Sequence, residues 1–128
     1  MAATIVLRMN SAFPADIVGL QVTEHGTDVC VVTVTGEVDA LTAPELAACL
    51  TEQLAVARLV VVDLDGVDLL ASAGLRVLFE MDQLATEQDR HLRLVCNSPT
   101  VNLVVQTAGL RDHFTCVDNV ADALDDTP

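Results

Sequence analysis

The stretch from residue 58 to residue 75 constrains the fold more than any other part of the chain. It begins with the apolar run Arg58 to Asp63, continues through an acidic segment and ends in a helix-like pattern that starts at Ser72. A short apolar run bounded by turn-forming residues predicts a buried strand. A short polar residue directly before an apolar-periodic segment predicts a helix N-cap, so we expect the Ser72 hydroxyl to accept hydrogen bonds from the first free N–H groups of that helix.

Two further strands are expected earlier in the chain, over Gly19–His25 and Thr27–Thr35. The first alternates apolar residues with polar or small ones, as burial of one face requires. The second is β-branched and nearly continuous, which is typical of a central strand, and Gly36 is expected to end it. The turn signal at Gly26 predicts that the two strands form an antiparallel hairpin.

A helix is expected to begin at Thr42, because a capping threonine and Pro44 are both start signals. Leu46, Leu50 and Leu54 recur at every fourth position, which gives this helix a narrow buried stripe. Strand, helix and strand in this order predict a βαβ unit with a right-handed crossover. The later elements expected from the same patterns are a helix over 72–88, a strand over 91–95, a helix over 98–109, a short edge strand over 114–117 and a last helical segment over 120–124.

This alternation predicts an α/β fold. We expect one domain with a mixed β-sheet of four to five strands, an N-terminal antiparallel hairpin and helices packed mainly on one face of the sheet. Residues 1–15 are expected to form a loosely ordered lead-in, residues 16–124 the domain and residues 125–128 an acidic tail.

The charge of the chain excludes several kinds of partner. The formal net charge is −13 and no residue is a lysine, so the basic surface of a nucleic-acid binder or of a protein that docks on anionic lipid is missing. No apolar run reaches the about 18 residues of a membrane span, and polar residues interrupt the N-terminus before a signal-peptide core can form. We therefore predict a cytoplasmic protein whose partner presents a basic or amphipathic surface.

No motif for catalysis, cofactor binding or metal binding is found. The glycines form neither a phosphate-binding loop nor a dinucleotide fingerprint, and the histidines are scattered. The four cysteines contain no Cys-x-x-Cys pair, so we expect buried free thiols and neither a metal nor a cofactor. A redox switch is the alternative, because four cysteines allow three pairings: the residues are Cys30, Cys49, Cys96 and Cys116.

The acidic segment before Ser72 has two interpretations. Asp63, Asp65 and Asp68 are close enough to suggest a cation site, but the further oxygen ligands of a calcium loop do not follow them. A solvated acidic loop at the carboxyl end of a strand is the simpler interpretation. The functional alternative is that these acids, together with Glu37 and Asp39, face basic residues of a partner.

Three segments carry a resemblance to a known family. Residues 61–75 resemble the phospho-acceptor loop of the bacterial anti-sigma factor antagonists, which are STAS-domain proteins. Residues 36–46 look like the Gly-Glu-hydrophobic-Asp opening of that family, and residues 98–110 look like its third helix. The family loop usually reads Asp-Ser-Ser/Thr-Gly-Leu, whereas Ser72 lies here between Ala71 and Ala73. The match extends over roughly residues 18–124.

The resemblance implies a non-enzymatic binding module. Such a protein binds an anti-sigma factor of the serine-kinase ATPase type, frees a sigma factor and is switched off by phosphorylation at Ser72, with a serine phosphatase as a further candidate partner. Gly74 would let a partner backbone approach closely, and Arg76 lies one turn after Ser72, where it can contact a phosphate. The residues expected to bind the partner are Glu37, Asp39, Asp65, Asp68, Ala71, Ser72, Ala73, Gly74 and Arg76.

Two alternatives stay open. The first is a STAS module of a stressosome-like or transporter-associated complex, in which the serine is not modified. The second is an enzyme that carries a phosphate on Ser72, but no general acid or base stands next to this residue in the sequence.

Overall fold

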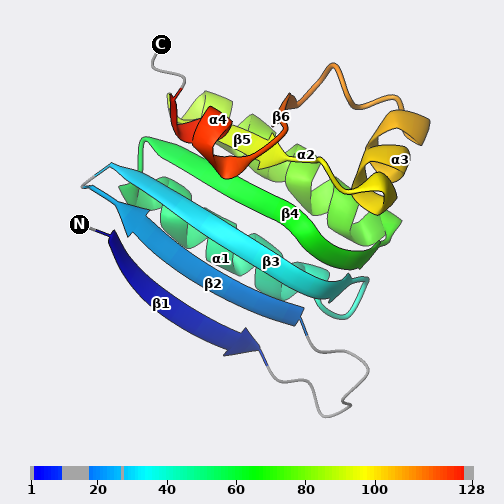
Figure 1. The fold of residues 1–128 in the computed structure, drawn as a ribbon, viewed down its shortest axis with the longest axis horizontal. Helices are drawn as coiled ribbons and strands as arrows, with labels where there is room; N and C mark the ends of the chain where they lie inside the picture. The colour runs from blue at the N-terminus through cyan, green and yellow to red at the C-terminus, as the bar shows by residue number, and fades with distance from the viewer. Residues whose placement is uncertain (1, 10–17, 27, 126–128) are drawn as a thin grey trace.

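The computed structural model describes residues 2–9, 18–26 and 28–125, which form a single sheet covered by helices (Figure 1). The six strands of these residues lie in the sheet in the order in which they occur in the chain. Neighbouring strands are antiparallel from β1 to β3 and parallel from β3 to β6. The strands are β1 (Ala2–Met9), β2 (Val18–His25), β3 (Val29–Val38), β4 (Leu59–Leu70), β5 (His91–Val95) and β6 (Thr115–Val117).

The helices cover the two faces of the sheet unequally. Helices α1 (Ala43–Val56) and α2 (Ser72–Glu87) lie side by side behind the sheet in Figure 1, and α3 (Pro99–Thr107) packs against β4 at one end of it. Side chains from these three helices share the main hydrophobic core. Helix α4 (Val120–Asp125) packs on the opposite face over a smaller cluster. The predicted α/β fold, with a mixed sheet and helices mainly on one face, is confirmed.

The core shows why these residues form these elements. Leu46, Leu50 and Leu54, the predicted stripe of α1, are fully buried. In β4, Val60 and Val62 face the main core, whereas Val61 faces the cluster under α4. Because both faces of β4 are covered at its start, the first four residues of the strand form a continuous buried apolar run.

Strand β1 differs from the sequence expectation. The sequence predicts a loosely ordered lead-in over residues 1–15, but Ala2–Met9 pair with β2 from Ala2 opposite His25 to Met9 opposite Val18. The five predicted strands are all present, and β1 is added to them. The strand pairs with the edge of β2, which is a contact between distant parts of the chain that local sequence patterns do not reveal. The rest of the predicted lead-in, residues 10–15, and residues 126–128 of the predicted tail lie outside the described residues.

Candidate functional site

The acidic segment before Ser72 is the end of β4 and not a loop. Strand β4 continues to Leu70 and pairs with β3 up to Val38. The register shifts twice, between Thr33 and Thr35 and between Gly36 and Glu37 on β3, and β4 contributes one extra residue at each shift. Such bulges bend a strand and redirect its side chains. The predictions of a loop after Asp63 and of a strand end at Gly36 are therefore wrong.

Ser72 is the first residue of α2, and its side chain is exposed. The N-cap position is taken by Ala71, whose backbone is extended and whose N–H donates to the Val38 carbonyl at 2.8 Å. No side chain caps α2, and no acidic residue lies in its first turn. The prediction that the Ser72 hydroxyl caps the helix is wrong, because Ser72 lies one residue too late. Ser72 is therefore exposed at a helix N-terminus whose first turn holds no acidic side chain.

Asp39 shapes the turn between β3 and α1. Its Oδ1 accepts hydrogen bonds from the backbone N–H groups of Leu41 at 3.0 Å and of Thr42 at 3.1 Å. The bond from the Thr42 N–H is the largest of several that hold the pKa of the Asp39 carboxyl below its usual range. The Thr42 hydroxyl donates to the Glu37 carbonyl at 3.0 Å and makes no cap of its own on α1. The Asp39 carboxylate thus has a structural partner within its own chain.

Asp65 joins β4 to the start of α3. Its Oδ1 accepts from the backbone N–H groups of Asn97 and of Ser98, at 3.1 Å each. Glu37 and Asp68 are exposed near the same end of the sheet. Of the predicted acidic residues, Asp39 and Asp65 therefore have contacts within the fold, whereas Glu37 and Asp68 face solvent.

The small residues after Ser72 differ in their surroundings. Gly74 is buried, and a Cβ on it would lie 2.5 Å from Val38 Cγ1 and 2.8 Å from Leu70 Cδ1. Glycine is therefore needed for α2 to approach β3 and β4, and this residue faces the core instead of a partner. Ala73 is half-buried against the same core. Arg76 is exposed, and its Nε lies 3.9 Å from Glu80 Oε2.

The structure contains a groove beside Ser72 that the sequence patterns do not predict. It has a volume of about 390 Å³ and lies between α2 and α3, lined by Ser72, Leu75, Leu103, Val104, Thr107 and Ala108. Leu103 is 65% exposed at its edge. The buried face of α3 consists of Val101 and Val105. Leu103, between them in the sequence, is a further large apolar residue that this face does not bury. That excess of apolar residues on a short helix is the signal that could have revealed the groove.

Two more exposed leucines lie at the same end of the molecule. Leu41 belongs to the turn between β3 and α1, and Leu69 pairs with Glu37 at the end of β4. Because parallel strands end at one edge of the sheet, these residues and the start of α2 lie at that edge. We define the Ser72 surface as the groove together with Glu37, Leu41, Asp68, Leu69 and Arg76.

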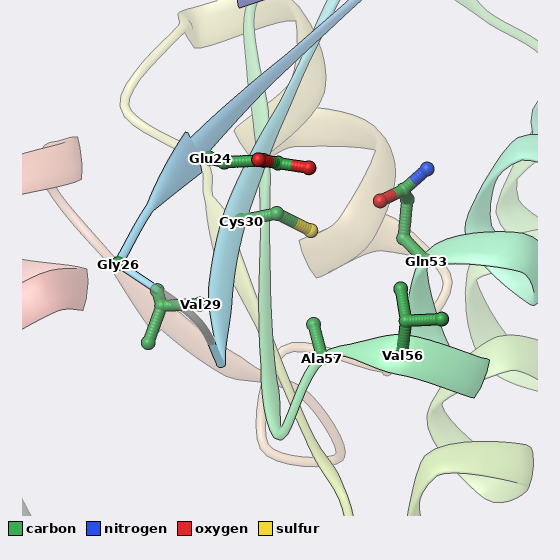
Figure 2. A pocket seen from close by; sticks show the side chains of 7 residues that line it. All are labelled: Glu24, Gly26, Val29, Cys30, Gln53, Val56 and Ala57. Atoms are coloured by element: carbon green, nitrogen blue, oxygen red, sulfur yellow. The ribbon is translucent and has the colours of Figure 1, made fainter. Parts of the chain in front are cut away.

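A second pocket lies at the opposite end of the sheet, where the β2–β3 hairpin meets the end of α1 (Figure 2). It has a volume of about 280 Å³, and Glu24, Cys30 and Gln53 are the polar residues that line it. Burial raises the pKa of the Cys30 thiol to about 12, so this cysteine is not a nucleophile. In the described part of the chain, no group of three or more His, Cys, Asp or Glu side chains is arranged to hold a metal ion.

Comparison with known proteins gives one family. The family model of the STAS domain matches residues 20–123. None of the curated proteins matches the chain in sequence. Among the helices of the described residues, none is long and apolar enough to cross a membrane.

Several solved structures share the fold. An anti-sigma factor antagonist from Mycobacterium paratuberculosis is 28% identical, with a TM-score of 0.75 over 89% of this chain and 96% of that one. The anti-sigma factor antagonist SpoIIAA in its unphosphorylated form is 18% identical, with a TM-score of 0.70 over 83% and 93% of the two chains. The phosphorylated form of SpoIIAA, a Bacillus cell fate determinant, is 17% identical, with a TM-score of 0.65 over 83% and 96%.

Proposed function

Since the chain belongs to the STAS domain family, we propose that it is an anti-sigma factor antagonist that is switched off by phosphorylation at Ser72. Its partner is then an anti-sigma factor of the serine-kinase ATPase type, in the cytoplasm, and binding of that partner frees a sigma factor. The 28% identity to an anti-sigma factor antagonist over nearly the whole chain supports this proposal.

The observation that carries the proposal is the position of Ser72. This exposed hydroxyl lies at the N-terminus of α2, where neither a cap nor an acidic residue is present. Free N–H groups and the helix dipole favour an anion at such a position. Arg76 lies one turn later with only a weak surface contact to Glu80, so its guanidinium is available to a phosphate. The fold can therefore carry a phosphate at Ser72 without unfolding.

The surroundings of Ser72 suit a protein partner. An apolar groove and exposed leucines provide area to bury, while Glu37 and Asp68 provide negative charge at the edge. Apolar contacts at the centre and charged groups at the rim are typical of protein interfaces. A phosphate on Ser72 would place a strongly hydrated, doubly negative group at the groove, which opposes the burial of a partner there.

A kinase reaction tests the modification. The protein is incubated with a serine-kinase anti-sigma factor that it captures from extracts of its own cells, together with ATP and Mg²⁺, and the phosphate is mapped by mass spectrometry. We expect one phosphate, on Ser72, and none in the Ser72→Ala variant. Ser98→Ala, which removes the serine whose side chain caps α3, is the control and should still be phosphorylated on Ser72. A phosphate mapped to another residue would contradict the proposal.

A module that is never phosphorylated is the second candidate, because Ala71 and Ala73 replace the acid and the hydroxyl that usually flank the serine in this family. Such a module would act in a stressosome-like or transporter-associated complex. Stable partner binding by the wild type, with no phosphate added by the kinase, would favour this second function.

A further inference from the structure

Cys96 and Cys116 lie on neighbouring segments of the sheet and belong to the same hydrophobic cluster. Cys96 directly follows β5, and its backbone N–H donates to the Val117 carbonyl at 3.1 Å. Cys116 lies in β6, opposite Leu94 of β5. Both side chains pack with Leu94 against the main core, so they lie on the same face of the sheet. The sheet therefore brings these two cysteines to adjacent positions on one face, although they are far apart in the sequence.

The two thiols differ in exposure and acidity. Cys96 is buried, whereas Cys116 is only partly buried. The hydrogen bond from Cys96, together with the charge of Arg111, lowers the pKa of Cys116 to about 7 against the effect of burial. The same hydrogen bond and burial raise the pKa of Cys96. Because the thiolate is the reactive form, Cys116 is the nucleophile of the pair.

We propose that Cys96 and Cys116 are a reversible redox pair that closes to a disulfide when the protein meets a peroxide. The Cys116 thiolate attacks one peroxide oxygen, so that an S–O bond forms, the O–O bond breaks and the leaving hydroxide takes up a proton to become water. Cys116 is then a sulfenic acid. The Cys96 sulfur attacks the Cys116 sulfur and loses its proton, the S–S bond forms and the oxygen leaves as a second water. Two electrons pass from the thiols to the peroxide.

The disulfide would enclose all of α3. This helix supplies Leu103 and Val104, which form one wall of the groove beside Ser72. A crosslink between the ends of this segment restricts the unfolded chain and ties α3 to the sheet. We expect the oxidised protein to have a melting temperature several degrees higher than that of the reduced protein.

Cys30 and Cys49 provide a control within the same chain. They face the main core from β3 and α1, and both are at most 3% exposed. Burial raises their pKa values to about 12 and about 11. Little thiolate forms at either residue at neutral pH, so both should stay reduced under conditions that oxidise Cys116.

Peroxide treatment followed by peptide mapping tests the pair. Reduced protein is treated with hydrogen peroxide, the remaining thiols are alkylated, and the products are analysed by mass spectrometry. We expect loss of two hydrogen atoms, a single crosslink between Cys96 and Cys116, and reversal by dithiothreitol. Cys49→Ser should form the same crosslink, whereas Cys96→Ser should accumulate a sulfenic acid on Cys116 that dimedone traps.

Labelling of the wild type keeps the test independent of how the variants fold. Brief exposure to limiting iodoacetamide at neutral pH should modify Cys116 before the other three cysteines. Preferential labelling of Cys30 or Cys49, a crosslink that includes either of them, or no intramolecular disulfide in peroxide-treated wild type would overturn the proposal. None of these measurements depends on the anti-sigma factor, so the two proposals can fail separately.

Discussion

At the scale of the residue, Ser72 is set apart by the lack of a structural contact for its hydroxyl. Other residues of this region make contacts within the fold. The Ala71 N–H donates to the Val38 carbonyl, Gly74 packs on β3 and β4, and Asp65 accepts hydrogen bonds from the start of α3. The sequence predicted that Ser72 stands at a helix start, because the apolar periodicity after it is clear. It could not place the N-cap on Ala71, because that position depends on a hydrogen bond across to β3.

Gly74 gives the first prediction. From the sequence, Gly74 is expected to let a partner backbone approach closely, but the structure places it against β3 and β4. Gly74→Ala should lower the free energy of unfolding by about 1 to 3 kcal/mol, because the new methyl group overlaps Val38 and Leu70. Denaturant unfolding measures this change.

The control for Gly74→Ala is an alanine-to-glycine substitution at an exposed position of another helix. Ala48→Gly in α1 changes helix propensity without a clash and should be destabilising by about 1 kcal/mol. By propensity alone, Gly74→Ala would be stabilising. A Gly74→Ala protein that is more stable than the wild type would therefore show that α2 does not approach the sheet as closely as described.

Asp39 gives a pH-dependent prediction. Its pKa in the folded protein lies below the ordinary value of 3.8, chiefly because of the hydrogen bond from the Thr42 N–H. A lowered carboxyl pKa contributes stability that is fully present above the unfolded-state value and is lost as the pH falls through the folded-state value. The wild type should thus lose more stability below about pH 4 than Asp39→Asn does.

Denaturant unfolding over a pH series measures this difference. Asp68→Asn makes the same change in net charge at an exposed position and is the control. If the stability of Asp39→Asn falls in parallel with that of the wild type at acidic pH, the hydrogen bonds of Asp39 do not stabilise its charged form.

At the scale of the element, the end of β4 is what positions the site. The sequence revealed β4 as a buried strand through its apolar run, but the two bulges that carry it on to Leu70 depend on pairing with β3. Strand β1 escaped prediction for a similar reason, because it is held by the edge of β2. Elements with a strong internal period, such as α1, were predicted well. Strand segments that depend on pairing with a neighbouring strand, such as β1 and the end of β4, were not predicted.

Asp65 links two of these elements and gives a third prediction. Asp65→Ala removes the acceptor for the N–H groups of Asn97 and Ser98 and should lower the free energy of unfolding by about 1 to 2 kcal/mol. Hydrogen exchange at these two amides should become faster. Asp68→Ala, at an exposed position three residues later, should leave their exchange unchanged. Equal exchange in the two variants would show that Asp65 does not hold the start of α3.

At the scale of the whole molecule, function is expected at one end of the sheet. The sequence identified Ser72, Glu37 and Asp68 at this end, but the groove between α2 and α3 arises only when these helices pack, so local patterns did not reveal it. Val56 lines the pocket at the other end of the sheet and is about as exposed as Leu103. Because this pocket has no part in the proposed binding site, Val56 can serve as a control.

Substitution of two exposed apolar side chains tests whether the partner binds at the groove or at the opposite end of the sheet. Leu103 is 65% exposed beside the groove, and Val56 is 67% exposed at the opposite end. Leu103→Ala should weaken binding of the anti-sigma factor by about 1 to 3 kcal/mol, whereas Val56→Ala should leave the affinity unchanged. Neither should alter stability much, because both side chains are already in solvent. Titration calorimetry gives the affinities, and equal losses in both variants would argue against the groove as the binding site.

A phosphate on Ser72 is proposed to release the partner. The affinity of the serine-kinase anti-sigma factor is measured by calorimetry for the unmodified protein and for the same protein after complete phosphorylation, with thermal melts to show that both are folded. We expect binding at least about tenfold weaker after phosphorylation, which corresponds to about 1.4 kcal/mol or more. Ser72→Glu should show a smaller loss, because a carboxylate carries less charge than a phosphate. Equal affinities of the folded unmodified and phosphorylated proteins would contradict the switch.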